Sequence, residues 1–378
     1  MISVDKNHCC GCSSCAQRCP QQCIVMKVAE YGFLYPKADH DKCIGCGLCE
    51  EVCPSLRHGE PKDPLLIETA INPDCSVRRQ SSSGGVFTML AEYVLNEGGV
   101  VFGARFNEQW DVVVDYTESN DGLSAFRGSK YVQAVVGNAY QKTEEYLHKG
   151  RKVLFSGTPC QISGLRLFLR KEYENLLTVA IACHSVPSPL VWSEYLKGLK
   201  LRDISDIQFR DKRISWERYG LTIIHGNGKE FFQQYGDNPY MQLFLHGITI
   251  RPSCFNCPAK NGRSRADIVI GDCWGVSKML PDYDNDHLGI SLVICQTGKG
   301  AAAAEVAGIN GFQLQYYQVV ANNGGLTTNA RVPAERNAFW CSFLEEDNKG
   351  SVIKQFAHHY IPGLGGKLKQ FIKRLIYK

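Results

Sequence analysis

Residues 9–20 read CCGCSSCAQRCP, and residues 43–54 read CIGCGLCEEVCP. Both stretches have the spacing Cys-x2-Cys-x2-Cys-x3-Cys-Pro, in which three closely spaced thiolates bind one [4Fe–4S] cluster and the cysteine before the proline binds a second one. The two copies therefore predict a pair of clusters with crossed ligands, and a chain that moves single electrons. The ligands expected for the first cluster are Cys9, Cys12, Cys15 and Cys53, and those for the second are Cys43, Cys46, Cys49 and Cys19.

Structural zinc and disulfides are the alternatives for these cysteines. Zinc sites also use Cys-x2-Cys pairs, but a four-ligand site gives no reason for a third cysteine step and a proline in both copies. Disulfides suit secreted chains, and residues 1–6 do not open with the apolar run of a signal peptide. Cys10 and Cys23 lie off the spacing and are expected to be packing residues or spare thiols.

Length and composition exclude several classes of protein. A chain of 378 residues is long enough for about two or three domains. The net charge of +4 is too small to indicate nucleic acid as a partner, and no apolar run approaches the ~18 residues that span a bilayer. The chain has 18 cysteines and no secretory signal, which indicates metal binding in a reducing, cytoplasmic environment.

The chain is expected to divide into four parts and to have an α+β or α/β fold. Residues 1–60 form a bacterial ferredoxin-like module, with a helix at 44–51 and a hairpin from 24–27 and 32–36. The parts that follow are residues 65–145, residues 146–345 and a basic tail at 346–378. The end of this tail, from residue 366, alternates Lys and Arg with apolar residues, so it could lie on a membrane surface, dock on a partner or be a solvated terminal helix.

Two cysteines follow strands of a predicted βαβ unit. A helix at 86–96 and strands at 100–104 and 112–116 come first. Strands at 152–156 and 177–182 then flank a helix at 161–171, and a helical crossover joins parallel strands. Cys160 and Cys183 follow the carboxyl ends of these two strands. Because adjacent strands lie ~4.8 Å apart and ligands bind at this edge, the two thiols are expected to share one ligand.

A further Cys-x2-Cys pair completes a possible third site. Cys254 and Cys257, together with Cys160 and Cys183, are predicted to bind a third [4Fe–4S] cluster; zinc and free or redox-active thiols are the alternatives. The remaining cysteines are expected to be buried small apolar residues, with Cys273 as the likeliest exception because it neighbours Asp272. They are Cys75, Cys273, Cys295 and Cys341.

Six short motifs then follow one another along the chain. They are SSSGG (81–85), GSKYVQ (128–133), GTPCQ (157–161), CHSVPSP (183–189), RPSCFNC (251–257) and ADIVIGDCW (266–274). In this order they resemble the coenzyme F420 hydrogenase/dehydrogenase beta-subunit family, over roughly residues 65–300. The sequence departs from that pattern at Ser185, where Gly is expected, and at Cys273, where an aromatic residue is more frequent. Neither departure removes a proposed ligand.

The resemblance implies a flavoprotein with a mixed sheet, in which FAD lies next to a [4Fe–4S] cluster. Substrates in the wider family include the deazaflavin F420 and a hydroxymethyl tetrapyrrole, and similar stand-alone proteins are associated with surface-polysaccharide synthesis. The residues expected to bind the cofactor are Ser83, Gly84, Gly85, Lys130, Tyr131, Thr158 and Asp272. His184 is expected to protonate the substrate or the flavin.

Each of these residues also has an ordinary structural interpretation. Backbone N–H groups at Ser83–Gly85 could bind a pyrophosphate at a helix start, or residues 81–83 could simply cap that helix. Lys130 could lie on the solvated surface, Tyr131 in the core, and Asp272 in a turn. His184 could only hydrogen-bond the backbone, and the run Arg210–Lys212 is expected to be solvated.

The leading functional prediction is an iron–sulfur, flavin-dependent oxidoreductase, either a reductase or a dehydrogenase. Its partners would be an electron donor or acceptor protein, or a small redox substrate. The alternatives are an electron-transfer subunit without its own substrate, and a non-catalytic protein with structural or sensing clusters. No Gly-x-Gly-x-x-Gly follows a predicted strand, so a nicotinamide-binding Rossmann site is not indicated.

Overall fold

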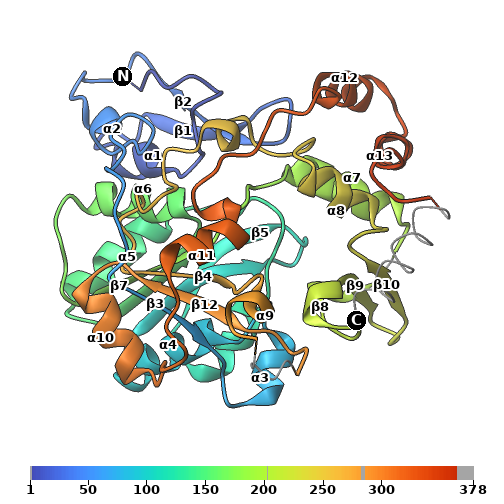
Figure 1. Cartoon of the computed structure of the whole chain (residues 1–378). Helices are drawn as coiled ribbons and strands as arrows, with labels where there is room; N and C mark the ends of the chain where they lie inside the picture. The colour runs from blue at the N-terminus through green and yellow to red at the C-terminus, as the bar shows by residue number, and fades with distance from the viewer. Residues whose placement is uncertain (1, 202, 282–285, 364–378) are drawn as a thin grey trace.

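The computed structural model describes residues 2–201, 203–281 and 286–363. Figure 1 shows three groups of elements: a small N-terminal module, a larger α/β unit beneath it, and a group of helices with a small sheet at one side. The predicted basic helix at 366–378 lies outside the described residues. None of the described helices is long and apolar enough to cross a membrane.

The N-terminal module has the predicted hairpin and two short helices. Its elements are α1 (Ser14–Arg18), β1 (Ile24–Val28), β2 (Leu34–Ala38) and α2 (Leu48–Glu51). β1 and β2 pair antiparallel. The predicted helix at 44–51 begins only at Leu48, because Gly45 and Gly47 have φ of 69° and 76°. These left-handed glycines leave the cysteines of this stretch on a loop before the helix.

The larger unit is built on a seven-stranded mixed sheet in the order β3-β12-β11-β7-β6-β4-β5. The strands are β3 (Leu66–Ala70), β4 (Val100–Phe106), β5 (Val112–Thr117), β6 (Val153–Gly157), β7 (Leu176–Ile181), β11 (Ile268–Asp272) and β12 (Ser291–Cys295). β11, β7, β6 and β4 run parallel to one another, whereas β5 and β12 are antiparallel to their neighbours. The predicted strands and their parallel βαβ pairing are confirmed.

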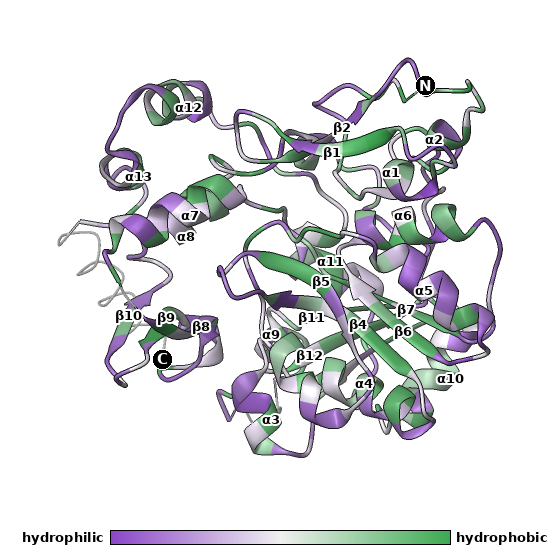
Figure 2. Ribbon diagram, turned by 180° about the vertical axis from the view of Figure 1, so that it is seen from behind, coloured by the Kyte–Doolittle hydropathy of each residue, from purple (hydrophilic) through white to green (hydrophobic). Residues whose placement is uncertain are grey.

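Helices cover both faces of this sheet because its central strands are apolar on both sides. Phe102 and Phe155 pack with the helices α5 (Ala139–His148) and α6 (Pro159–Leu169). Val101 and Leu154, which point to the other face, pack with α4 (Val86–Asn96) and α10 (Gly298–Val306). Figure 2 shows the resulting apolar strands enclosed between helices.

A proline and a capping box explain why α6 starts earlier than predicted. Helix α4 has its predicted bounds, but α6 begins two residues earlier than expected. Thr158 and Gln161 form a capping box there, and Pro159 takes the first helical position. The cap fixes the turn that carries Cys160. Shorter elements around the sheet are α3 (Cys75–Gln80), α9 (Val276–Met279), α11 (Tyr316–Asn322) and the 3₁₀ turns 120–126 and 324–326.

The third group has its own aromatic core. Its elements are α7 (Pro189–Gly198), β8 (Ile204–Asp211), β9 (Gly220–His225), β10 (Glu230–Gln234), α8 (Pro239–Leu245), α12 (Arg336–Glu345), α13 (Lys349–Ala357) and the 3₁₀ turns Trp216–Arg218 and Pro252–Asn256. Trp192, Phe209 and Tyr240 pack at its centre. The stacked rings of Tyr31 and Trp340, 4.3 Å apart, join this group to the N-terminal hairpin.

The four cysteines expected in apolar cores divide into two pairs. Cys273 and Cys295 are fully buried, as predicted. The prediction is wrong for Cys75 and Cys341, which are exposed. Cys75 is the first residue of α3, and Cys341 lies on the solvent side of α12. Both side chains therefore lie on the solvent-exposed surface of a helix and do not pack in an apolar core.

Candidate iron–sulfur and flavin sites

Two hollows in the N-terminal module are each lined by one predicted set of four ligand cysteines and by one further cysteine, Cys10 or Cys23. The inner cysteine set, Cys9, Cys12, Cys15 and Cys53, lines one of them. The outer cysteine set, Cys19, Cys43, Cys46 and Cys49, lines the other. Among the described residues no three His, Cys, Asp or Glu side chains are placed to hold a single metal ion. Four thiols around one open space are instead the donor set of a [4Fe–4S] cluster.

The two sets differ in their distance from solvent. In the outer set Cys46 is exposed, and the neighbouring Ile44 is 64% exposed. All four cysteines of the inner set are buried. Burial, and then the charges of Cys9 and Cys53, raises the pKa of Cys15 to about 12. The outer set therefore faces the surroundings, and the inner set faces the rest of the chain.

The inner set lies directly on helix α6. A Cβ atom at Gly164 would be 3.0 Å from both Cβ and Sγ of Cys12, and Ser14 Oγ donates to Gly164 O at 2.5 Å. Arg18 adds an ion pair with Glu144 at 3.1 Å. Glycine at position 164 is therefore what allows the module to approach the sheet unit this closely.

Replacing Gly164 by valine is expected to destabilise this junction by about 2 kcal/mol, because overpacking a closed contact typically costs about 1–3 kcal/mol. The midpoint of anaerobic thermal unfolding should fall by several degrees. The matched control is Gly298→Ala, also on a helix, where an added Cβ meets nothing within 4 Å. Equal stability of the Gly164→Val variant and the wild type would show that the contact is not close-packed.

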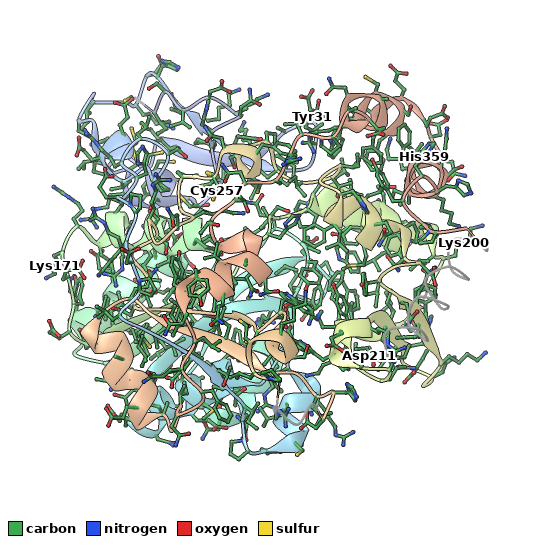
Figure 3. The ribbon with its side chains drawn as sticks, viewed as in Figure 1. Tyr31, Lys171, Lys200, Asp211, Cys257 and His359 are labelled. Carbon is green, nitrogen blue, oxygen red and sulfur yellow. The ribbon has the colours of Figure 1, made fainter. Side chains whose placement is uncertain are left out.

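The third cysteine set lies at the carboxyl ends of the parallel strands. It consists of Cys160, Cys183, Cys254 and Cys257. Cys160 follows β6, Cys183 follows the neighbouring parallel strand β7, and the other two lie at the turn 252–256. In all six pairs of this set the charge of one thiolate would raise the pKa of the other. Burial is the larger cause, and it raises the pKa of Cys254 to about 12. Figure 3 shows Cys257 between the N-terminal module and the sheet unit.

Cys10 joins the inner set to the third set. It is buried, and its thiol is within hydrogen-bonding reach of Cys12 and of Cys160. The hydrogen bond with Cys10 is also the largest cause that raises the pKa of Cys160. The sequence does not indicate this role of Cys10, because its spacing fits no cluster motif and Cys160 is 150 residues away along the chain. The thiols of two predicted cluster sites are thus separated by a single side chain.

The start of helix α4 is where the sequence predicts a pyrophosphate. Gly85 is the N-cap, with φ of 87° and no side-chain cap hydrogen bond. The three preceding serines do not cap the helix either: Ser81 donates to Val77 O, Ser82 bonds Ser129, and Ser83 donates to Ile290 O at 2.5 Å. The capping interpretation is therefore wrong for these serines.

Gly84 is required by packing at this point. A Cβ atom there would be 2.4 Å from Ala70 O and 2.6 Å from Ser291 N. The loop thus lies against the ends of β3 and β12, and glycine is needed whether or not a phosphate binds nearby.

Arg210 connects the residues around this loop. It forms a two-pronged ion pair with Asp272, at 3.0 and 3.1 Å, and donates to Ser82 O at 3.2 Å. Tyr131 Oη lies 3.4 Å away, and Trp216 Nε1 also donates to Asp272, at 2.7 Å. The expectation of a solvated Arg210–Lys212 run is wrong, since Arg210 is buried. Its partner Asp272 is 62 positions along the chain, so no local pattern indicates the pair.

Lys212 and Lys130 both serve backbone carbonyls. Lys212 Nζ donates to the carbonyl oxygens of Arg78, Ser83 and Leu288. Lys130 Nζ donates to those of residues 125, 127 and 128. Lys130 therefore stabilises the loop to which it belongs. The neighbouring Tyr131 packs on Phe244, with ring centroids 5.1 Å apart.

Thr158 and His184 lie beside the third cysteine set. Thr158 Oγ1 is 3.2 Å from Cys160 Sγ. His184 is exposed, and its ring hydrogen-bonds the backbone of Leu245 and lies 5.9 Å from the ring of Phe244. Phe244 thus touches Tyr131 on one side and His184 on the other. The candidate residues form two groups, one at the α4 start and one at the third set, joined through Phe244.

The fold and these sites define an iron–sulfur protein in which a two-cluster ferredoxin module docks on a mixed α/β sheet. Residues 8–56 match the 4Fe-4S dicluster domain, which implies two [4Fe–4S] clusters. Residues 69–140 and 150–314 match the coenzyme F420 hydrogenase/dehydrogenase beta subunit, N-term and C terminus respectively. The chain belongs to the F420 hydrogenase/dehydrogenase beta-subunit family, with an N-terminal dicluster domain.

Comparison with solved structures also found matching chains. A chain in the structure titled "Xenon derivatization of the F420-reducing [NiFe] hydrogenase complex from Methanosarcina barkeri" is 15% identical, with a TM-score of 0.44. The alignment covers 84% of this chain and 94% of that one. No curated protein matches the sequence significantly.

Proposed function

We propose that the chain is an iron–sulfur flavoprotein oxidoreductase that passes electrons between [4Fe–4S] clusters, FAD and a two-electron organic acceptor of the F420 kind. The observation that carries this proposal is the packing of Cys12 against Gly164, which lies on the same helix as Cys160, because it makes the inner and third cysteine sets neighbours. When bound, clusters supply single electrons and flavin couples them to two-electron chemistry.

The cysteine sets are proposed to bind three clusters in line. The outer set faces solvent and would meet an electron-carrying partner, and the inner set lies between it and the third set. Cys160 is fixed by the capping box at Thr158 and Gln161, while Cys183 extends from the neighbouring strand. Rigid strand ends and a capped helix are the supports that a preformed ligand set needs.

FAD is proposed to place its pyrophosphate at the start of α4. The N–H groups of this helix start, with Ser83, Gly84 and Gly85, would face the phosphates. Cations surround it: Arg210 and Lys212 hold the carbonyls of Ser82 and Ser83, and Arg127 Nε donates to Thr88 Oγ1. Arg210 Nε is buried with no acceptor among the described residues. This excess of donors and positive charge suits a dianionic group.

The remaining candidates are proposed to act between the phosphate end and the third set. Tyr131, backed by Phe244, would contact the flavin ring, and Asp272 would hold Arg210 in place. His184 has one ring nitrogen occupied by the Leu245 backbone, so the other can exchange a proton with the acceptor. Because His184 is exposed, its side chain is accessible to an organic substrate.

The second candidate function is an electron-transfer subunit that serves a partner oxidoreductase, favoured by the exposed Cys46 and Ile44 at the outer set. Steady-state assays of the isolated, fully loaded chain separate the two. An enzyme is expected to reduce a deazaflavin or a related planar acceptor with a reduced viologen dye as donor. Rapid exchange of electrons with dye but no turnover of any two-electron acceptor would favour the subunit.

A further inference from the structure

Arg251 is a fully buried cation between the inner and third cysteine sets. It is 0% exposed. Its Nε donates to Cys9 O at 2.7 Å, its Nη1 to Gln133 Oε1 at 2.8 Å, and its Nη2 to Leu34 O at 2.9 Å. Nη2 also lies 3.7 Å from Cys9 Sγ, a thiol of the inner set. The guanidinium is therefore held in one orientation, with a nitrogen facing a candidate ligand sulfur.

No carboxylate in the described part of the chain pairs with this buried charge. Among the ion pairs formed by the described residues, none includes Arg251. The rings of Phe33 and Tyr35, 5.3 and 4.3 Å away, offset the charge only in part. Guanidinium stays protonated in proteins, and burying it without a counter-charge is strongly unfavourable. Cluster-bound thiolates of the inner set, of which Cys9 Sγ is 3.7 Å away, would supply that counter-charge.

Arg251 also reaches the third set. Its carbonyl accepts from Cys254 N at 3.0 Å. Burial raises the pKa of Cys254, and the charge of Arg251 acts against that rise. Arg251 acts in the same direction at Cys160, where the hydrogen bond with Cys10 is the main raising cause. One cation is thus shared by two cysteine sets.

Lys260 provides a comparison, because it serves the third set alone. It is 5% exposed, and its Nζ donates to Thr328 O at 2.5 Å and approaches His184 O at 3.4 Å. Its charge lowers the pKa of Cys183 and of Cys257 against the larger effect of burial. None of the ion pairs among the described residues includes Lys260 either.

We propose that Arg251 is a shared counter-charge that raises the reduction potentials of the clusters bound by the inner and third sets, and that Lys260 does so for the third set alone. Reduction adds one electron to a cluster and breaks no bond, so a fixed cation favours the reduced form. Net charge and hydrogen bonds to the sulfurs both set cluster potentials. Electrons that enter at the outer set would therefore collect beside the sheet unit. The part that concerns the third set rests on the proposed function.

The test is a potentiometric titration of the anaerobic full-length chain, followed by electron paramagnetic resonance. Arg251→Gln should lower the ratio of reduced to oxidised cluster at a fixed potential about tenfold or more for two clusters, where tenfold corresponds to 59 mV for one electron. Lys260→Gln should shift one cluster only. The control is Arg57→Gln, an exposed residue of the N-terminal module paired with Glu51, which should shift none.

Unchanged potentials in Arg251→Gln would overturn the proposal. If that variant instead fails to keep the inner cluster, Arg251→Lys decides: regained iron supports a counter-charge, and continued loss shows that shape rather than charge matters. Iron content of the wild type separates this inference from the proposed function. With only two clusters bound the third-set proposals fail, and a shift of the inner cluster alone still supports the role of Arg251.

Discussion

Replacing Cys160 by serine is expected to remove about four of twelve irons per chain, because it takes one ligand from the third cysteine set. The outer and inner sets do not include Cys160, so the signals of their two clusters should persist. Flavin reduction by a one-electron donor should become much slower, since the proposed path ends at the third set. Iron and sulfide analysis, with spectra of the reduced protein, measures both effects.

The control for this variant is Cys10→Ala. Cys10 touches Cys160 but is proposed not to be a ligand, so this variant should keep all its iron. If Cys10→Ala loses iron and Cys160→Ser does not, the proposed ligands of the third cluster are incorrect.

Replacing Arg210 by methionine is expected to destabilise the chain by about 3–5 kcal/mol and to abolish flavin binding. Breaking a buried ion pair leaves an uncompensated charge, here on Asp272 beside Trp216. The same change removes a cation from the start of α4. Unfolding followed by tryptophan fluorescence gives the stability, and released flavin per chain gives the binding.

The matched control is Arg213→Met, three residues along the same segment. Arg213 is 39% exposed and pairs with Asp211 and Glu230, so its loss should cost about 1 kcal/mol or less. The double variant Arg210→Met with Asp272→Asn removes both charges and should regain part of the stability without regaining flavin. Full flavin content in Arg210→Met would contradict the proposed phosphate site.

The N-terminal module shows how far local spacing can predict a site. The positions of eight cysteines divide them into two groups of four, and each hollow of the structure is lined by one of these groups. Strand pairing at the sheet was also predictable, because apolar runs and a helical crossover allow few topologies. Cys160 and Cys183 follow neighbouring strands for that reason.

What could not be predicted depends on contacts between distant residues. In the sequence, Arg210 belongs to a charged run that is expected to be solvated, and its ion pair with Asp272 forms only in the folded chain. Arg251 lies in a recognisable motif, but nothing local indicates that its guanidinium reaches Cys9, 242 positions away. Cys10 likewise fits no spacing. Buried polar groups such as these acquire their roles from tertiary packing, and hydrophobic periodicity carries no information about them.

A single chain is proposed to bind three clusters and one flavin. The most direct test is anaerobic purification followed by quantitation of iron, acid-labile sulfide and released flavin per chain. We expect about twelve irons, about twelve sulfides and one FAD. About eight irons with no flavin would contradict it, and would leave a two-cluster electron carrier on this fold.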